Sequence, residues 1–280
     1  MTEQPTRRAP RAREAQVLRT ERITPHMVRL VLGGAGLDDF DATEFTDHYI
    51  KVLFAPAGVS YPQPFDLARI REEFAREQWP VTRTYTVRAW DPALRELTVD
   101  FVVHGDEGLA GPWAAKAQPG ETVLFQGPGG GYAPESDADW HLLAGDESAL
   151  PAIAAALERM PAGAVVHAFV EVSDPAEEQK IVSPAAVELT WLHRGERPVG
   201  EALVEAVRAL EFPAGTVSAF VHGEAGFVKE LRRQLRVEQG VPRERLSISG
   251  YWRFGQSDEA WRAAKRDWNA QVEAEQEQTG

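Results

Sequence analysis

The chain has 280 residues and a mass of 31.0 kDa, which gives room for about two domains of ordinary size. Its 30 basic and 43 acidic side chains leave a formal charge of −13, which argues against nucleic-acid binding, because that function needs a concentrated basic surface. The sequence contains no cysteine, so disulfides, thiolate nucleophiles, iron–sulfur clusters and covalently attached haem are excluded.

The lack of cysteine also limits any redox chemistry to a non-covalently held organic cofactor or to a metal site of histidines and carboxylates. The first 13 residues carry four arginines between prolines, and we interpret them as a solvated tail. No apolar segment follows them, which excludes a secretory signal, and no apolar run reaches the roughly 20 residues that span a bilayer. We therefore expect a cytoplasmic protein without membrane insertion.

The first half of the chain predicts β-strands bounded by glycine, proline and aspartate. Six strands without long helices between them predict a small antiparallel barrel. The segment Ala55–Val81 interrupts the pattern with a charged helical stretch at Leu67–Glu77, which we expect to cross the barrel surface. The predicted strands are Ala15–Glu21, Met27–Gly33, His48–Phe54, Thr82–Trp90, Glu96–His104 and Thr122–Gln126.

After Pro134 strands and helices alternate, which predicts a parallel sheet covered by helices. We expect a barrel domain over residues 15–134 and an α/β domain over residues 135–280. A closing amphipathic helix carries Trp261 and Trp268 one heptad apart, and Glu273–Gly280 is expected to fray. The strands are His141–Ala144, Val165–Val172, Val187–His193, Thr216–His222 and Leu246–Tyr251, and the helices are Ala149–Met160, Glu201–Leu210 and Phe227–Glu238.

The segment Arg83-Thr84-Tyr85-Thr86 lies within one of the barrel strands. Arg83 and Tyr85 project to one face of a strand, while the two threonines project to the other. The segment therefore offers a guanidinium that can pair with phosphate, an aromatic ring and hydroxyls for a polar ring edge. These groups are suited to a flavin nucleotide, although exposed strands often carry the same residue types.

The strand that ends Asp100-Phe101-Val102-Val103-His104 leads into a turn that contains Gly108, Ala110, Gly111 and Trp113. A glycine-bearing turn that opens a short helix exposes backbone N–H groups, which attract an anion. A pyrophosphate would fit there, with Arg83 supplying the balancing charge. The alternative is a plain turn with a helix that starts at Pro112, since proline is favoured at a first helical position.

Two strand-to-helix turns in the second lobe predict a nucleotide cleft. The first contains Asp146, Glu147 and Ser148, and the second contains Gly223 and Glu224. In open α/β sheets ligands bind at the carboxyl ends of the strands. The G-x-G-x-x-G pattern is absent, however, and the acidic residues could instead cap the helices.

The aromatic segment Gly250–Gly255 follows a strand and precedes the last helix, so we expect it between the lobes. Its tryptophan and phenylalanine could equally belong to a packed core. Arg253, which stands between them, is less easily buried without a partner.

Taken in series, RTYT, DFVVHG followed by GLAGPWA, GDESALPAI, HGEAGFVKELRRQL and SGYWRFG resemble the siderophore-interacting protein family. These proteins are FAD-dependent ferric-siderophore reductases related to the ferredoxin reductases. The resemblance runs from about Ala15 to Trp268. It implies an FAD-binding barrel followed by an NAD(P)H-binding α/β domain.

The resemblance also implies residue roles. Arg83, Tyr85 and Thr86 would hold the flavin, the strand from Asp100 would run beside its ribityl and adenosine parts, and the turn from Gly108 would hold its pyrophosphate. Lys51 and Arg253 match positions of a basic pocket for the ferric complex. The implied cofactor-binding residues are Arg83, Thr84, Tyr85, Thr86, Asp100, Phe101, Val102, Val103, His104, Gly108, Ala110, Gly111, Trp113, Asp146, Glu147, Ser148, Arg194, Gly223 and Glu224.

The chain departs from the family pattern in two places. The turn usually reads G-P-A-S, whereas here it is Gly108-Leu109-Ala110-Gly111, without the serine hydroxyl. Gly129 stands where relatives often have arginine, so one pocket cation is missing. Beside a strongly anionic triscatecholate, less charged hydroxamate or mixed chelators therefore stay open as substrates. Arg194 could meet the 2′-phosphate of NADPH or be an ordinary surface arginine, and both interpretations stay open.

We therefore predict that NADPH or NADH reduces FAD, and that electrons then pass singly to a ferric siderophore or another ferric chelate. No side chain is expected to act as nucleophile or general acid, and no resident metal is expected. We expect a monomer. One alternative is a general flavin reductase or the reductase partner of an oxygenase. Another is a non-catalytic siderophore-binding protein, which would leave the flavin segments without a purpose.

Overall fold

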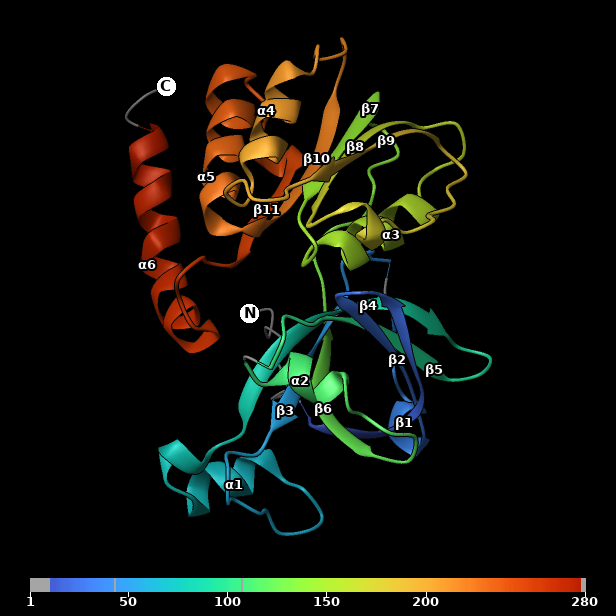
Figure 1. Cartoon of the computed structure of the whole chain (residues 1–280), viewed down its shortest axis with the longest axis vertical. Helices are drawn as coiled ribbons and strands as arrows, with labels where there is room; N and C mark the ends of the chain where they lie inside the picture. Colours follow the sequence, from blue (N-terminus) through green and yellow to red (C-terminus); the bar gives the residue numbers. More distant parts are fainter. Residues whose placement is uncertain (1–10, 43, 107, 278–280) are drawn as a thin grey trace, which may run out of the picture.

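The computed structural model describes residues 11–42, 44–106 and 108–277 and contains two lobes (Figure 1). The first is a closed six-stranded antiparallel barrel in the order β1-β2-β5-β4-β3-β6, so the predicted barrel is confirmed. Its strands are β1 (Arg13–Thr24), β2 (Met27–Gly33), β3 (Tyr49–Phe54), β4 (Val81–Asp91), β5 (Glu96–Val102) and β6 (Thr122–Gly129).

The barrel interior is filled by every second residue of its strands. Ile50 and Val52 of β3 are 0% and 1% exposed, and Phe101 of β5 is fully buried. The short helix α2 (Ala110–Ala114) packs against β5 through Trp113, whose ring centroid lies 5.7 Å from that of Phe101. The alternation predicted for half-buried strands therefore holds, and α2 adds an aromatic side chain to the barrel core.

The insertion between β3 and β4 is less regular than predicted. Helix α1 (Leu67–Glu73) begins at Asp66, whose side chain accepts hydrogen bonds from the amides of Ala68 and Arg69. It ends at Phe74, which has extended backbone, and a separate 3-10 turn follows at Arg76–Gln78. The prediction of a continuous helix over Leu67–Glu77 is therefore wrong. At the break, the centroid of the Phe74 ring lies 5.6 Å from that of the Tyr61 ring.

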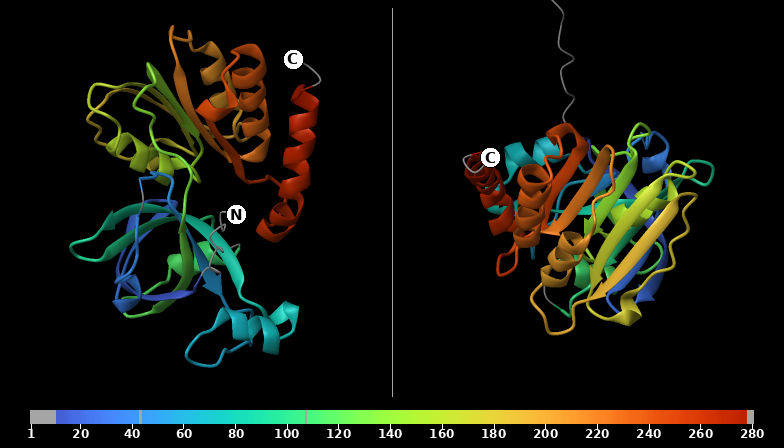
Figure 2. Two further views of the ribbon diagram at one scale, coloured as in Figure 1. Left: turned by 180° about the vertical axis from the view of Figure 1, so that it is seen from behind. Right: turned by 90° about the horizontal axis from the view of Figure 1, so that it is seen from above.

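The second lobe is a five-stranded parallel sheet in the order β11-β10-β7-β8-β9, as predicted for alternating strands and helices. Helix α3 (Leu150–Glu158) packs on one face, while α4 (Glu201–Ala209) and α5 (Ala225–Arg233) cover the other (Figures 1 and 2). A π-helical turn, Gln234–Glu238, extends α5. The strands are β7 (Trp140–Gly145), β8 (Val165–Val172), β9 (Ala186–His193), β10 (Val217–Glu224) and β11 (Leu246–Trp252).

The last helix, α6 (Asp258–Glu277), connects the two lobes along the outside of α5 (Figure 1). At its start Arg262 donates to the Thr82 carbonyl of β4 over 2.9 Å. Near its end Lys229 and Arg232 of α5 pair with Glu275 and Glu273 over 2.6 and 3.0 Å. These ion pairs explain why the helix continues through Glu277 and why the fraying expected from Glu273 is wrong for the described residues. No helix in the described ranges is long and apolar enough to cross a membrane.

Polar contacts also fix the lobes to each other beside α3. Glu177, 2% exposed in the 3-10 turn Pro175–Glu177 after β8, accepts the Thr24 hydroxyl over 2.5 Å and pairs with the His26 ring nitrogen over 2.7 Å. Arg88 of β4 donates to Glu158 of α3 over 2.7 Å. Removing the partners of a buried carboxylate is costly, so these contacts tie the barrel to the second lobe.

His222 gives the fold a defined acid sensitivity. Burial lowers its pKa to about 3, whereas histidine in the unfolded chain titrates near 6.5. Its stabilising contribution is therefore complete above pH 6.5 and is lost as the pH falls toward 3, which amounts to about 2 kcal/mol between pH 6.5 and 5. Urea denaturation at several pH values should show that acid lowers the free energy of unfolding less in His222→Phe than in the wild-type protein. His193→Gln, which changes a partly exposed histidine, is the control, and an unchanged slope in His222→Phe would contradict this assignment.

Candidate functional site

The segment Arg83–Thr86 has the alternation predicted for it. In the pairing of β3 with β4, Val52 faces Arg83 and Ile50 faces Tyr85, and both partners belong to the barrel core. Lys51 and Tyr49 face Thr84 and Thr86 in the same register. The Tyr85 ring lies 4.2 Å from the Phe101 ring between centroids, and burial raises the pKa of its hydroxyl. Tyr85 is therefore a neutral aromatic surface at physiological pH.

Arg83 is held by two carboxylates at the start of α6. Its Nη2 lies 2.6 Å from Glu259 Oε1 and its Nη1 lies 3.3 Å from Asp258 Oδ2, and its side chain is only 17% exposed. A phosphate that approached this guanidinium would share it with those two groups. This pairing could not be predicted from the sequence, because acidic residues at a helix start usually complement the helix dipole.

An aromatic wall and an uncapped helix start lie next to Tyr85. Trp113 of α2 packs edge-on against Phe54, with ring centroids 5.4 Å apart, as well as against Phe101. Among the described residues, no side chain makes a capping hydrogen bond to the first turn of α2. A Cβ atom on Gly111 would lie 3.0 Å from the Val102 carbonyl oxygen, so close packing of α2 on β5 accounts for glycine in place of the serine. Backbone N–H groups at a helix start and aromatic side chains are groups that suit a flavin dinucleotide.

The strand from Asp100 to His104 exposes fewer side chains to a possible cofactor than predicted. Asp100 is 2% exposed and accepts two hydrogen bonds from Arg29, over 2.7 and 2.8 Å. Phe101 is fully buried, Val103 is 6% exposed, and β5 ends at Val102. The side chains of these three residues are therefore used in packing and pairing within the fold. His104 lies on the surface, with its ring centroid 6.5 Å from that of His26.

Asp146 is a buried hub at the carboxyl edge of the sheet. It is 0% exposed, and burial raises its pKa to about 6. Its Oδ1 accepts from the Ser148 amide and hydroxyl over 2.9 and 2.5 Å. Its Oδ2 accepts from the Glu224 amide and the Trp252 indole, both over 2.8 Å. One carboxylate therefore connects the ends of β7, β10 and β11.

Glu224 supports the same loop from the other side. Its Oε2 caps α5 by accepting the Gly226 amide over 2.5 Å, and its Oε1 accepts the Phe254 amide over 3.2 Å. Gly223 has φ +139°, and a Cβ atom there would lie 2.7 Å from the Asp146 carboxyl carbon. Asp146, Gly223 and Glu224 thus brace the residues on both sides of Arg253, a function that the strand-end pattern did not reveal.

Glu147 and Arg194 meet, as expected for residues of one cleft. Arg194 Nη2 lies 2.8 Å from Glu147 Oε1, and its Nη1 lies 3.4 Å from the fully buried Glu171. The guanidinium is 16% exposed. A 2′-phosphate at this position would have to compete with these two carboxylates for Arg194.

Lys51 and Arg253 have aromatic partners and no carboxylate partner among the described residues. The Lys51 ammonium lies 5.9 Å from the centre of the Tyr49 ring, and the Arg253 guanidinium lies 5.9 Å from the centre of the Trp268 ring. The pairing of β10 with β11 shifts register between Gly250 and Trp252, which changes the side-chain alternation just before Arg253. Both cations keep a charge that an anionic ligand can neutralise.

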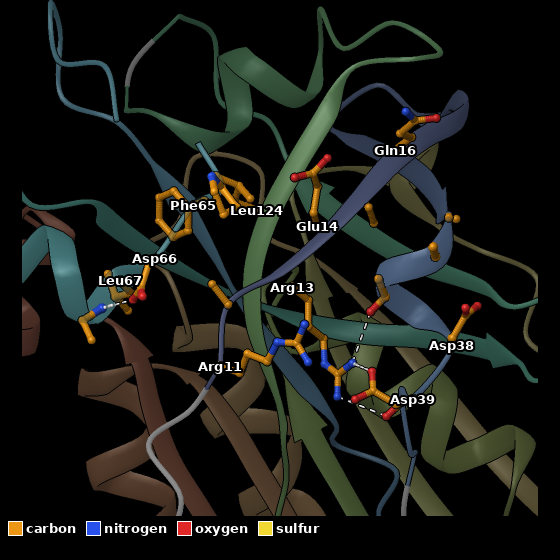
Figure 3. A pocket seen from close by; sticks show the side chains of 18 of the residues that line it. Arg11, Arg13, Glu14, Gln16, Asp38, Asp39, Phe65, Asp66, Leu67 and Leu124 are labelled. Carbon is orange, nitrogen blue, oxygen red and sulfur yellow. Dashed lines mark hydrogen bonds and ion pairs between the residues drawn. The ribbon is translucent and has the colours of Figure 1, made fainter. Parts of the chain in front are cut away.

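A further cavity lies away from these residues, between the start of β1 and α1 (Figure 3). It has a volume of about 1060 Å³ and is lined by Arg13, Asp39, Phe65 and Leu124, among others. Arg13 pairs with Asp39, and none of the predicted site residues lines the cavity. No group of three histidine, aspartate or glutamate side chains in the described ranges could hold a metal ion.

Comparison with known proteins agrees with the motifs. A model of the siderophore-interacting FAD-binding domain matches residues 16–132, and a model of the siderophore-interacting protein matches residues 138–255. The ferric vibriobactin reductase ViuB of Vibrio cholerae is 36% identical over 87% of this chain and 90% of its own. The NADPH-dependent ferric-chelate reductase of Escherichia coli is 34% identical, over 86% and 93%. The crystal structure of a siderophore utilization protein from T. fusca is 40% identical, with a TM-score of 0.77 over 89% and 96%.

Loss of the Asp146 carboxylate should weaken the fold, because it leaves buried donors from Ser148, Glu224 and Trp252 without an acceptor. We expect Asp146→Ala to lower the free energy of unfolding by about 3 kcal/mol in urea denaturation. Asp106→Ala, at a side chain that is 94% exposed, is the matched control and should change little. A loss below about 1 kcal/mol in Asp146→Ala would contradict its role as a hub.

Proposed function

The chain belongs to the siderophore-interacting protein family, and we propose that it is an FAD-dependent ferric-siderophore reductase that takes electrons from NADPH or NADH. The named activities of the Vibrio cholerae and Escherichia coli relatives support this reaction. The observation that carries the proposal is a pair of cations that have no carboxylate partner in the part of the chain that the structure describes. These are Lys51, beside the strand of Arg83–Thr86, and Arg253, at the end of β11.

Residues 15–134 would bind FAD and residues 135–280 would bind the nicotinamide nucleotide. Tyr85 and Trp113 would supply apolar contacts to the flavin, Thr84 and Thr86 would offer hydroxyls, and the amides that follow Gly108 would bind the pyrophosphate. Arg83 would reach the same phosphates from its position between β4 and α6. Bound FAD would accept two electrons together and pass them singly to Fe(III), which the protein supports by positioning and electrostatics.

The ferric chelate would dock against Lys51 and Arg253. Many ferric chelates are anionic, and in a chain of net charge −13 two cations without acidic partners give such a ligand a favourable place to bind. Fe(II) is softer than Fe(III) and binds hard oxygen ligands less tightly, so reduction releases the metal. Because reductant and released iron are both used inside the cell, we propose that the protein acts in the cytoplasm, as a monomer.

The purified protein should be yellow, with a flavin absorbance band, and should oxidise NADPH or NADH when a ferric chelate is present. Initial rates with a ferric chelate are compared with rates on free flavin, and titration with each nucleotide measures its preference. Faster reduction of free flavin would support a general flavin reductase instead. A colourless protein that binds the chelate without oxidising either nucleotide would support a binding protein.

Substitution of Arg83 and of Lys51 should distinguish a residue that binds the cofactor from one that binds the substrate. Arg83→Ala removes the guanidinium beside β4, so we expect it to lose FAD during gel filtration. Lys51→Ala should keep FAD and raise KM for the ferric chelate about tenfold, because one charge contact is lost. Flavin absorbance per protein and steady-state KM are the two measurements. If both variants hold FAD and reduce the chelate normally, these roles are wrong.

A further inference from the structure

The ring of Tyr49 occupies the space beside Gly129. The two residues face each other in the pairing of β3 with β6. A Cβ atom on Gly129 would lie 2.4 Å from Tyr49 Cζ, 2.6 Å from its hydroxyl oxygen and 2.7 Å from Cε2. Such distances are far below van der Waals contact, so a side chain at position 129 and the present position of the Tyr49 ring exclude each other.

Tyr49 also supports one of the two substrate cations. Lys51 lies two residues further along β3, on the same face of the strand, and its ammonium sits 5.9 Å from the centre of the Tyr49 ring. An aromatic face attracts a cation but does not neutralise it. The ring therefore orients Lys51 and leaves its charge available to a ligand.

The same ring lies close to the second lobe. Burial raises the pKa of the Tyr251 hydroxyl, and Tyr49 is among the groups close enough to raise it further. Tyr251 belongs to β11 and stands two residues before Arg253, which rests on the Trp268 ring of α6. Lys51 and Arg253 therefore each contact an aromatic ring. The Tyr49 phenol occupies the space that a longer side chain at position 129 would need, and such a side chain could have carried a third positive charge.

We propose that Tyr49 and Gly129 act as one specificity unit, an inference that rests on the reductase function proposed above. Tyr49 gives the substrate an aromatic surface in place of a third cation. The preferred substrate is then a ferric chelate of low net negative charge that carries aromatic phenolate ligands. A trianionic triscatecholate would be left with a charge that two cations do not match.

The effect of substrate charge can be distinguished from that of aromatic ligands by comparing three ferric chelates. These are a mixed phenolate–hydroxamate, a neutral trishydroxamate and a triscatecholate. We expect the wild-type protein to show its highest kcat/KM with the mixed chelate. Tyr49→Phe should keep most of that preference, because the ring remains. Tyr49→Ala should lower kcat/KM for the mixed chelate about tenfold and leave the trishydroxamate nearly unchanged.

The structure also predicts strong coupling between positions 49 and 129. Gly129→Arg alone should lower Tm, because its side chain meets the Tyr49 ring. The double variant Tyr49→Ala/Gly129→Arg should recover Tm and raise kcat/KM for the triscatecholate relative to the mixed chelate about tenfold. Gly131→Arg is the matched control, because a Cβ atom there has no neighbour within 4 Å, and its Tm should stay unchanged.

Each result has a distinct meaning. If Gly129→Arg keeps its Tm with Tyr49 present, or if the double variant does not change the ratio between chelates, the specificity unit is wrong while the reductase function stands. Loss of FAD from Tyr49→Ala would place the ring in the flavin site and also overturn the proposal. If the wild-type protein reduces none of the three chelates, the reductase function itself fails and the specificity proposal fails with it.

Discussion

The carboxylate of Asp146 is the interaction on which the geometry of the candidate site depends. A fully buried acidic group is costly unless hydrogen bonds satisfy it, and here four donors converge on its two oxygen atoms. Those donors come from the ends of β7, β10 and β11. The loop that carries Arg253 is therefore tied at Trp252 by Asp146 and at Phe254 by Glu224. This bracing holds the backbone on both sides of Arg253 at the end of β11.

The four cations of the candidate site differ in their partners. Arg83 and Arg194, which the sequence predicts to contact the cofactors, each contact two carboxylates. Lys51 and Arg253 instead rest on aromatic rings. Cation–π contacts hold a long side chain without cancelling its charge, whereas an ion pair removes most of its attraction for a second anion. Lys51 and Arg253 therefore differ in electrostatic setting from Arg83 and Arg194.

Much of the fold could be predicted from the sequence, because strand alternation and the change of pattern after Pro134 are local signals. The strand faces around Arg83 and Tyr85 follow from the two-residue period alone. The pairing of Arg83 with Glu259 could not be predicted, since these residues are far apart in the chain and meet only when α6 packs. The ion pairs that keep α6 helical beyond Glu273 are also tertiary. Asp146 and Glu224 look like helix caps in the sequence, and only the packed sheet shows that they brace the next loop.

Single-turnover electron transfer tests the central claim most directly. The FAD-loaded protein is reduced with NADPH without oxygen, excess nucleotide is removed, and the sample is mixed rapidly with a ferric chelate while flavin absorbance and a colorimetric Fe(II) trap are followed together. The account predicts that the flavin band returns as Fe(II) appears, with about two Fe(II) formed per flavin, because each iron accepts one electron. A flavin band that returns only after oxygen or free flavin is added, with no Fe(II) formed, would contradict it.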